Sequence, residues 1–498
     1  KGPLVALLIR GSCVLLGPLS ESLTGNLALA IRLPAVVCGV LLLASLYVLT
    51  VQALGRERLA FAVVALALTL PPVAAASTLM TIDAPYLACW GWALVFGHAA
   101  AVGGRRWAWP LAGLAVGVGI LAKYTMALWL PSMALFLVME LGAGRARLLP
   151  SRERSRLGRS LALPAGFWLA CAIAGVFTLP IAYWNARNDW VTVRHVGWQA
   201  GVEQRDGWRR LGPAVYVGEQ AALLLGVWFV AWAGGVWAAR PWRDPEPSRR
   251  YLWCLSLPTF AVFLAASLKT SGQVNWPAAA YLSGGVLAAG WLDERVRSPR
   301  PGVRKATRLA VAGAAALGLA LTLVIHYPTT VARPLFVALA GPPTPDRPRP
   351  LRRVDPTFRL RGWRTLAAAV DEARAEVRAG GEEPVVVATI WTLPGVLGAY
   401  CDGHPTVYTI GLALGDRWSQ YDLWRPNPVR DADAFRGRTF VLVGVPALAV
   451  YEAFDAVEPP RSVVYAEGDQ PITDWCVTVA RGYRGFGPPD RFLRSARH

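Results

Sequence analysis

One carboxylate, Asp83, lies between two long apolar segments, in the sequence Met80-Thr-Ile-Asp-Ala-Pro-Tyr86. A carboxylate at the mouth of a helix bundle is costly unless it is solvated, paired or used in chemistry. Asp83 can activate a hydroxyl acceptor, bind a divalent cation or orient another group. The alternative is a helix N-cap, because Pro85 suits the first turn of a helix that begins here. The sequence leaves both interpretations open, and one residue can serve both.

Two lysines are candidates for binding a phosphate group. Lys123 precedes Tyr124 in a short polar turn, where the ammonium supplies a point charge and the phenol a hydrogen-bond donor. The alternative is that Lys123 snorkels to the membrane interface, as lysines at helix ends do. Lys1 precedes Gly2 and Pro3, and a lysine before a proline-initiated helix can hold an anionic head group near the helix N-terminus.

The loop 184–212 is a candidate for substrate recognition. It combines four tryptophans with Asn185 and His195, and indole faces together with amides and cations suit sugars and phosphates. The alternative is an interfacial aromatic belt, which also uses tryptophan. A belt explains the tryptophans but not the polar residues between them, so we favour recognition.

A second polar segment, 267–277, is also expected on the side of the membrane that carries Asp83. Lys269, Gln273 and Asn275 lie within eleven residues and can converge on one ligand. The alternative is a simple turn between two membrane spans. The local sequence does not separate these two interpretations. The segment is a candidate because it is expected on the same side of the membrane as Asp83.

Charge and motif content exclude several other functions. The net charge of +19 is uneven: residues 1–327 hold 30 Lys/Arg against 13 Asp/Glu, while residues 328–498 hold 21 against 19. The basic excess belongs to loops between apolar segments, and no basic stripe with interleaved aromatics suggests a nucleic-acid partner. The five histidines are scattered without metal-ligand spacing, so no metal site is predicted, although a divalent cation at Asp83 stays open.

The apolar segments predict a polytopic α-helical membrane protein. About 30 Å of hydrocarbon requires roughly 17 to 25 apolar residues in a helix, because lipid offers no partner for unpaired backbone groups. Residues 4–19 contain an arginine and are short, so an interfacial helix is expected there as an alternative to a span. About ten spans are predicted, at 28–54, 59–76, 85–102, 108–122, 124–140, 161–183, 213–239, 251–268, 276–292 and 309–326.

The distribution of basic residues in the loops predicts the orientation of the chain. One alternate set of loops, from 55–58 to 293–308, holds twenty Lys and Arg, whereas the opposite set, from 77–84 to 269–275, holds seven. Because basic loops stay in the cytoplasm, the second set and everything after residue 327 should face the outside or the periplasm. A multi-pass protein of the inner (plasma) membrane is therefore expected, with Asp83 on its outer face.

The chain after residue 327 has a different composition. Residues 328–362 read as a linker, and 363–498 as an extracytoplasmic α/β domain that begins with an amphipathic helix at 363–379. Strands are predicted at 384–390, 405–410, 439–444 and 475–480. No glycine-rich phosphate-binding pattern occurs in this domain, so we expect no nucleotide site there. Cys401 and Cys476 either pair or stay free thiols, and the sequence does not decide between the two.

Several short motifs, taken in order and spacing, resemble those of the membrane glycosyltransferases of family 39. This group holds the protein O-mannosyltransferases and the lipid A aminoarabinose transferases, and the resemblance covers nearly the whole chain. It is carried by Lys1-Gly-Pro-Leu4, Arg32-Leu-Pro34, Thr81-Ile-Asp-Ala-Pro85, Leu121-Ala-Lys-Tyr124, Tyr183-Trp-Asn-Ala-Arg-Asn-Asp-Trp190, Asn275-Trp-Pro277 and Ser419-Gln-Tyr-Asp-Leu-Trp424.

The resemblance implies a GT-C-like fold and the transfer of a sugar from a polyprenyl-phosphate carrier to a lipid, glycan or protein acceptor at the outer membrane face. An acidic residue would deprotonate or orient the acceptor, and cations would stabilise the departing lipid phosphate. Asp83 matches one acidic position of the family. The phosphate ligands would be Lys1, Lys123 and Lys269. The substrate-binding group would be Tyr124, Asn185, His195, Gln273, Asn275 and Trp276.

The chain departs from the family pattern at its first residue. The principal catalytic acid of the family lies in the first outer loop, before the position of Lys1, and the chain begins at Lys1 rather than at Met. We therefore expect that a natural N-terminal segment is missing. The Lys1-Gly2 pair also replaces the commoner His-Pro of the family.

Two other classes of protein compete with the enzyme. A transporter or flippase for lipid-linked sugars should show repeated halves and polar residues at the midplane. The spans here are nearly free of charge and the polar groups collect at one face, which favours the enzyme. A carbohydrate- or protein-binding module on a passive anchor ranks last, because ten spans exceed what an anchor needs.

Overall fold

The computed structural model describes residues 2–142, 163–199, 208–355, 357–416 and 419–487. The chain divides into two compact units. The first contains the chain as far as Ser20 and then Ala28–Thr322, and the second contains Glu21–Leu27 and the chain from Leu323 onward. Each unit is described by itself.

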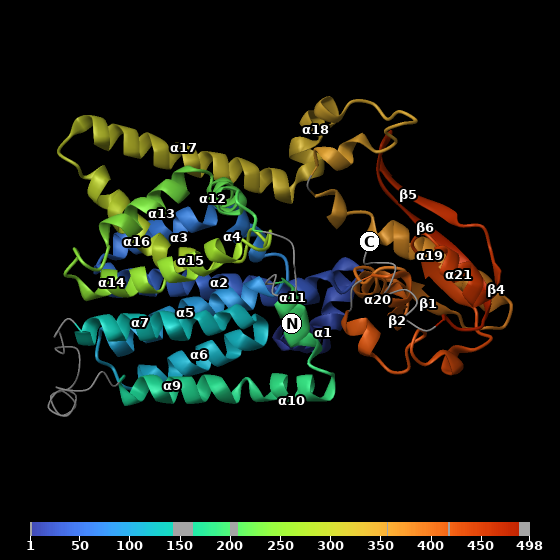
Figure 1. The fold of residues 1–498 in the computed structure, drawn as a ribbon. Helices are drawn as coiled ribbons and strands as arrows, with labels where there is room; N and C mark the ends of the chain where they lie inside the picture. The colour runs from blue at the N-terminus through green and yellow to red at the C-terminus, as the bar shows by residue number, and fades with distance from the viewer. Residues whose placement is uncertain (1, 143–162, 200–207, 356, 417–418, 488–498) are drawn as a thin grey trace. The chain divides into compact units, whose positions relative to one another are not determined.

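The first unit is entirely helical in the part that the structure describes (Figure 1). Its elements are α1 (Leu4–Thr24), α2 (Ala28–Leu54), α3 (Glu57–Leu68), α4 (Pro71–Ala76), α5 (Asp83–Ala101), α6 (Ala108–Ala122), η1 (Tyr124–Leu128), α7 (Trp129–Gly142), α9 (Ala165–Val176), α10 (Leu179–Arg187), α11 (Val191–Gln199), α12 (Gly212–Leu223), α13 (Val227–Ala238), α14 (Pro247–Cys254), α15 (Leu257–Ala266), α16 (Ala280–Val296) and α17 (Pro301–His326).

Small residues let these helices approach closely. In Figure 1, α2, α5, α6 and α9 run beside one another, and each neighbouring pair is in contact. A Cβ atom added at Gly113 of α6 would lie 2.7 Å from the Cα of Ala170 on α9. One added at Gly91 of α5 would lie 2.0 Å from the Oγ of Ser45 on α2. Lipid gives no hydrophobic drive between helices, so this close packing is what joins them.

Most of the predicted spans are present but many are broken. Segment 28–54 is one continuous helix, α2, and 108–122 is α6, with the bounds that the sequence predicts. The segment 213–239 is split into α12 and α13, which meet at 111°. Leu225 and Gly226 form this break with positive φ values of 53° and 68°, a conformation that glycine adopts readily.

By length and composition, five described helical segments can each cross a membrane, or six if the bent pair counts as one span. They include α1, which extends to Thr24 and reaches 21 residues. The expected helix at 4–19 was therefore too short, because the helix continues past Pro18 through the mostly polar residues 20–24. That all ten predicted segments cross the membrane stays a prediction.

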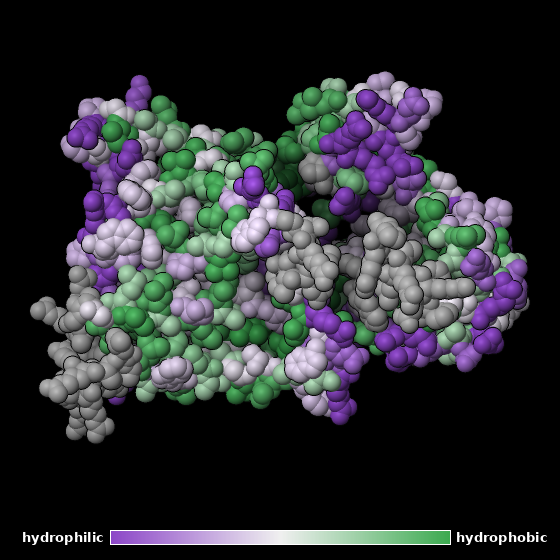
Figure 2. Space-filling model, in the orientation of Figure 1, coloured by the Kyte–Doolittle hydropathy of each residue, from purple (hydrophilic) through white to green (hydrophobic). Residues whose placement is uncertain are grey.

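The surface of the helical unit fits a lipid environment. Figure 2 shows apolar side chains across its visible face, and polar ones gathered at the end where α16 leads into α17. At that end Arg249 donates to Glu294 at 2.8 Å, and Arg56 pairs with Asp293. These ion pairs join three of the basic loops that the sequence places in the cytoplasm.

The second unit contains a six-stranded mixed sheet with the order β2-β1-β3-β6-β4, and β5 pairs with β6. The strands β1, β2 and β3 are parallel, and β6 runs antiparallel to β3, β4 and β5. The bounds are β1 (Val385–Ala388), β2 (Val407–Thr409), β3 (Phe440–Val443), β4 (Phe454–Val457), β5 (Arg461–Glu467) and β6 (Gln470–Tyr483).

Helices cover the sheet and complete the second unit. The amphipathic α19 packs its buried side chains, such as Leu366 and Val370, against β3, β5 and β6. The remaining bounds are η3 (Pro328–Ala332), α18 (Arg333–Ala340), η4 (Pro350–Arg353), η5 (Phe358–Leu360), α19 (Trp363–Ala379), α20 (Pro394–Tyr400), η6 (Gly411–Leu414), η7 (Gln420–Leu423), η8 (Ala432–Phe435) and α21 (Leu448–Ala453).

The four predicted strands are found, with β6 longer than expected, but β4 and β5 were missed. Most side chains of β5 are exposed or half-buried, so its sequence lacks the apolar run that marks the central strands. The stretch 328–362, expected to be a linker, instead forms helical turns that belong to the second unit, because Leu351 is buried. Cys401 and Cys476 are both free thiols.

Candidate functional site

Asp83 is the first residue of α5, but its side chain does not cap the helix. The N-cap position belongs to Ile82, and no side-chain cap is formed there. The backbone N–H of Asp83 donates to the hydroxyl of Thr81 at 3.2 Å. The carboxylate is thus free of the capping role that the sequence allowed, and it lies at the positive end of the α5 dipole, which favours a negative charge.

Lys123 donates to one oxygen of this carboxylate. The distance from its Nζ to Oδ1 of Asp83 is 2.8 Å, and the side chains are only 10% and 16% exposed. Lys123 ends α6 in an extended conformation, with φ at −149°, and this turn directs it toward α5. Its ammonium also lies 5.1 Å from the ring centroid of Tyr86, a cation–π contact. Lys123 therefore points into the bundle and does not snorkel outward.

Asn275 donates to the other carboxylate oxygen. Its Nδ2 lies 2.6 Å from Oδ2 of Asp83, although 192 residues separate the two. Three segments that are distant in the chain therefore meet at one carboxylate: the start of α5, the end of α6 and the turn before α16. The sequence named all three residues as candidates, and the structure brings them together.

A buried glutamine holds the turn that carries Asn275. Gln220 of α12 is fully buried, and its Nε2 donates to the carbonyl oxygen of Val274 at 2.9 Å. The hydroxyl of Tyr281 donates to Oε1 of Gln220 at 2.8 Å. Sequence reasoning missed Gln220. The signal was available, because an uncharged polar residue inside an apolar span needs a partner in lipid.

The turn at Lys123 is also joined to the loop predicted for substrate recognition. Tyr124 is half-buried and its hydroxyl bonds to the side chain of Thr192 on α11. His195, half-buried as well, lies three residues further along the same helix. The structure thus places α11 beside the Asp83–Lys123 pair.

Other predicted residues have different surroundings. Asn185 is 2% exposed, and its side chain joins α10 to α11. Its Nδ2 donates to the carbonyl of Ile181 at 2.9 Å, and its Oδ1 accepts from the N–H of Thr192 at 3.1 Å. These bonds use one N–H and one lone pair of the amide, and its role as a substrate ligand stays a prediction.

The remaining candidates lie along the turn before α16. Lys269 stacks over Trp208, with its Nζ 4.5 Å from the ring centroid. Trp276 packs on Phe263 at 5.9 Å, and the side chain of Gln273 is exposed. None of these contacts reaches Asp83, so their roles as ligands stay predictions.

Lys1 lies outside the described residues, but its neighbour is informative. A Cβ atom at Gly2 would lie 2.0 Å from the carbonyl oxygen of Leu121. Position 2 therefore packs against the chain two residues before Lys123, and only glycine fits there. The motif that contains Lys1 thus joins the end of α6 that carries the candidate site.

The groups around Asp83 are hydrogen-bond donors and not further oxygen ligands. Both carboxylate oxygens face N–H donors, one of them cationic, whereas a divalent cation needs several oxygen ligands. Within the described part of the chain, no group of three or more His, Cys, Asp or Glu is arranged to hold a metal ion.

Part of the chain is similar to known proteins. Residues 3–152 match the family described as dolichyl-phosphate-mannose-protein mannosyltransferase, a range that includes Asp83 and Lys123. The lipid A galacturonosyltransferase RgtD of Rhizobium johnstonii is 26% identical over 185 residues. That match covers 36% of this chain and 34% of the relative, so it spans about a third of either protein.

Two solved structures of ArnT from Cupriavidus metallidurans share the fold over nearly the entire chain. The structure bound to undecaprenyl phosphate has a TM-score of 0.54 at 16% identity, covering 98% of this chain and 89% of ArnT. The apo structure has a TM-score of 0.51 at 17% identity, covering 96% and 87%. The chain has the fold of the GT-C glycosyltransferases. In this chain, the helical unit carries the candidate site, and the α/β unit follows it in sequence.

Proposed function

We propose that this GT-C chain transfers a sugar from a polyprenyl-phosphate carrier to a lipid, glycan or protein acceptor at the outer face of the inner (plasma) membrane. The observation that carries the proposal is the carboxylate of Asp83 held between Lys123 and Asn275. The same fold binds undecaprenyl phosphate in ArnT, which supports a polyprenyl-phosphate donor here.

Each group at the site has a role in this reaction. The acceptor hydroxyl attacks the anomeric carbon with inversion, the bond from that carbon to the phosphate oxygen breaks, and the lipid phosphate departs. Asp83 accepts the hydroxyl proton or orients the acceptor, and Asn275 fixes the carboxylate. Lys123, with Lys1 and Lys269, stabilises the charge that develops on the phosphate.

Lys123 can serve Asp83 and a phosphate together. An ammonium has three donors, and Asp83 accepts one of them. The cation–π contact with Tyr86 uses the face of the ring and no proton. An incoming phosphate oxygen therefore extends the ion pair without breaking it.

Replacement of Asp83 by Asn tests the proposal. We expect Asp83→Asn to lower transfer by at least 100-fold, as the loss of a general base does. The variant should still elute as a single species with an unchanged melting temperature. Turnover would be measured with radiolabelled polyprenyl-phosphate sugars in detergent, on the full-length protein.

Glu57→Gln is the matched control, because it also converts a carboxylate to an amide at the first residue of a helix of the same unit. Glu57 is exposed and lies in the loop 55–58, which the sequence places on the opposite side of the membrane from Asp83. We expect this variant to keep wild-type turnover. Transfer by Asp83→Asn at the wild-type rate would remove Asp83 from the reaction.

A further inference from the structure

The α/β unit contains a cavity of about 520 Å³ that the proposed reaction does not use. It lies at the edge of the sheet where the parallel strands β1 and β2 begin. Its charged lining consists of Arg374 and Arg378 from α19, Arg438 from the start of β3, Glu383 just before β1, and Asp402. Three guanidinium groups and two carboxylates thus face one cavity.

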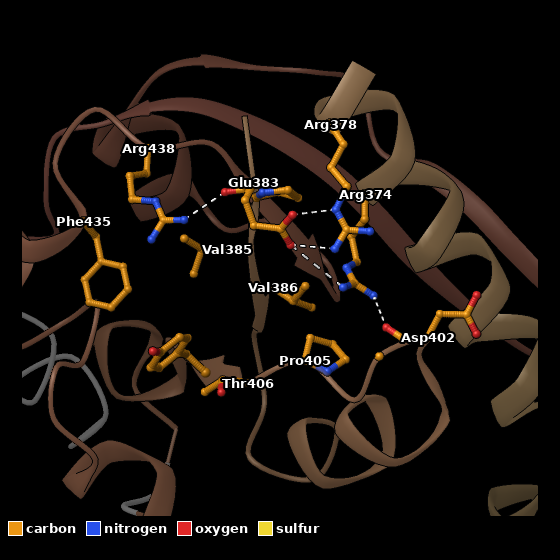
Figure 3. A pocket seen from close by; sticks show the side chains of 13 residues that line it. Arg374, Arg378, Glu383, Val385, Val386, Asp402, Pro405, Thr406, Phe435 and Arg438 are labelled. Carbon is orange, nitrogen blue, oxygen red and sulfur yellow. Dashed lines mark hydrogen bonds and ion pairs between the residues drawn. The ribbon is translucent and has the colours of Figure 1, made fainter. Parts of the chain in front are cut away.

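The carboxylate of Glu383 already pairs with guanidinium groups of this cavity. Figure 3 shows Glu383 directed at Arg378, while Arg438 approaches from the other side. Nε and Nη2 of Arg378 donate to the two oxygens of Glu383 at 2.5 and 2.7 Å, a bidentate pair. Nη2 of Arg374 lies 4.0 Å from the same carboxylate, and Arg438 donates to the backbone carbonyl of Glu383 at 2.8 Å.

This internal pair is easily replaced by an external anion. The side chains of Arg378 and Glu383 are 46% and 58% exposed, and ion pairs that are so exposed contribute little to stability. If Glu383 rotates into solvent, Arg378 and Arg438 remain, with the guanidinium of Arg374 behind them. A carboxylate or phosphate of a ligand then finds the same bidentate geometry.

Arg374 supplies a second, independent observation at this cavity. Its side chain is only 4% exposed, and its Nε–H has no acceptor in the part of the chain that the structure describes. Its Nη1 donates to Asp371 and to the carbonyl of Asp402. A buried donor without an acceptor is uncommon in folded proteins, and it calls for an acceptor from outside the chain.

The uncharged lining suits a sugar ring. Tyr408 and Phe435 form an edge-to-face pair with ring centroids 5.3 Å apart, and Pro405, Thr406 and Val386 complete the wall opposite the arginines. Apolar and aromatic surfaces with a few convergent polar groups are typical of small-molecule sites.

We propose that this cavity binds a saccharide that carries a carboxylate or a phosphate, and that Glu383 occupies the anion position when the ligand is absent. The identification of this saccharide as part of the acceptor rests on the proposed transferase function. The binding itself does not depend on transfer.

Calorimetric titration of the full chain in detergent tests the proposal. The probes are galacturonic acid and glucose 6-phosphate, with glucose and inorganic phosphate for comparison. We expect the wild type to bind one or both anionic sugars at least tenfold more tightly than glucose and than inorganic phosphate. Which of the two binds identifies the anionic group.

Variants of the lining should change affinity in opposite directions. Arg378→Gln and Arg438→Gln should each weaken binding of the anionic sugar by about tenfold, because each removes a charged donor. Glu383→Gln should strengthen it, because the competing carboxylate is gone. Arg436→Gln is the control, since this exposed arginine pairs with Asp433 and does not line the cavity, and it should bind as the wild type does.

Three results would overturn the proposal. These are equal binding of glucose, equal binding of inorganic phosphate, and weaker binding by Glu383→Gln. Asp83→Asn separates this proposal from the transferase function, because it should bind the anionic sugar unchanged. Transfer without such binding would count against the cavity alone, and binding without transfer against the transferase alone.

Discussion

Two ion pairs inside the helical unit have different geometries, and the difference indicates which of them is available for chemistry. Arg250 and Glu140 form a bidentate pair, with distances of 2.6 and 3.0 Å, and Arg250 also donates to the carbonyl of Asp244. Such a closed pair leaves no donor directed at a ligand and holds helices together. The Asp83–Lys123 pair is monodentate, so the ammonium keeps further donors for a substrate.

In the α/β unit, Asp422 provides a test at the scale of a single titrating group. Its Oδ2 accepts from the N–H and the hydroxyl of Ser419, each at 2.7 Å, which forms a capping box. Its Oδ1 is buried without a partner among the described residues. Burial raises the pKa of Asp422 above its ordinary value, an effect that the Ser419 donors oppose only in part.

The raised pKa predicts the direction of a pH effect on stability. The folded protein binds a proton at Asp422 before the unfolded chain does, so acidification through the raised pKa stabilises the fold. This stability is fully present below the unfolded pKa and is lost as the pH rises through the folded pKa. The melting temperature of the wild type should therefore rise relative to that of Asp422→Asn as the pH falls from 7 to 4.

Differential scanning fluorimetry in detergent measures this difference. Asp433→Asn is the control, because its side chain is 90% exposed. That variant should follow the pH profile of the wild type. If the melting temperature of the wild type fell relative to that of Asp422→Asn on acidification, the assignment would be contradicted.

At the scale of elements, the site depends on two interruptions in the helices. The chain leaves helical geometry at Lys123, between α6 and η1, and at Leu225–Gly226, between α12 and α13. The first turns an ammonium toward α5. The second begins five residues after Gln220 and two residues after Leu223, the last residue of α12. Gln220 supports the turn with Asn275 from the side.

Replacement of Gln220 should therefore lower activity without direct contact with substrate. Gln220→Ala removes the hydrogen bond to the carbonyl of Val274, a loss of about 0.5–1.5 kcal/mol, and frees the turn that holds Asn275. We expect kcat to fall about tenfold with little change in KM. Hydrogen exchange of the amides in 272–276 should accelerate in the same variant.

Two companion variants separate positioning from general destabilisation. Tyr281→Phe removes only the bond to Oε1 of Gln220 and should have a smaller effect. Glu219→Gln changes the preceding residue of α12 and should leave kcat and amide exchange as in the wild type. If Gln220→Ala lowered only the amount of folded protein and kept the wild-type kcat, Gln220 would be a packing residue.

These elements show which parts of the fold the sequence predicts. Helical segments were located well, because apolar length is a global property of a window and the bilayer fixes the length required. The turn at Lys123 was predicted, because a charged residue separates two apolar segments there, but the break at Leu225–Gly226 was missed, because the conformation of these two residues is decided by packing. Leu225, with its positive φ, has no local signal at all.

The candidate site followed the same rule. Asp83, Lys123 and Asn275 were identified because polar residues next to apolar spans are rare and need partners. Their contacts to one another join residues up to 192 positions apart, and no periodicity encodes such a distance. Asn185 differs from these three residues, because its partners are local backbone groups, and its role as a substrate ligand stays a prediction.

At the scale of the molecule, the two ends of α5 differ in charge, and this difference agrees with the orientation in the membrane that the basic loops predict. Asp83 begins this 19-residue helix, and the basic loop 103–107 follows its end, about 28 Å away at the rise of an α-helix. The predicted cytoplasmic loops 55–58, 240–250 and 293–308 are joined by ion pairs in the same unit. The basic loop 141–160 lies outside the described residues from position 143 onward.

Cysteine labelling tests this orientation in intact cells. Asp469→Cys places a thiol on an exposed position of the turn between β5 and β6, and Gly302→Cys places one on α17, where an added Cβ atom meets no neighbouring atom. If the α/β domain is extracytoplasmic, an impermeant maleimide should label Asp469→Cys from outside, and Gly302→Cys only after the membrane is opened. The parent chain, with its native cysteines, gives the background. The reverse labelling pattern would place Asp83 on the cytoplasmic face. The sugar would then have to be transferred before its carrier lipid crossed the membrane, so the proposed reaction would take place on the cytoplasmic side.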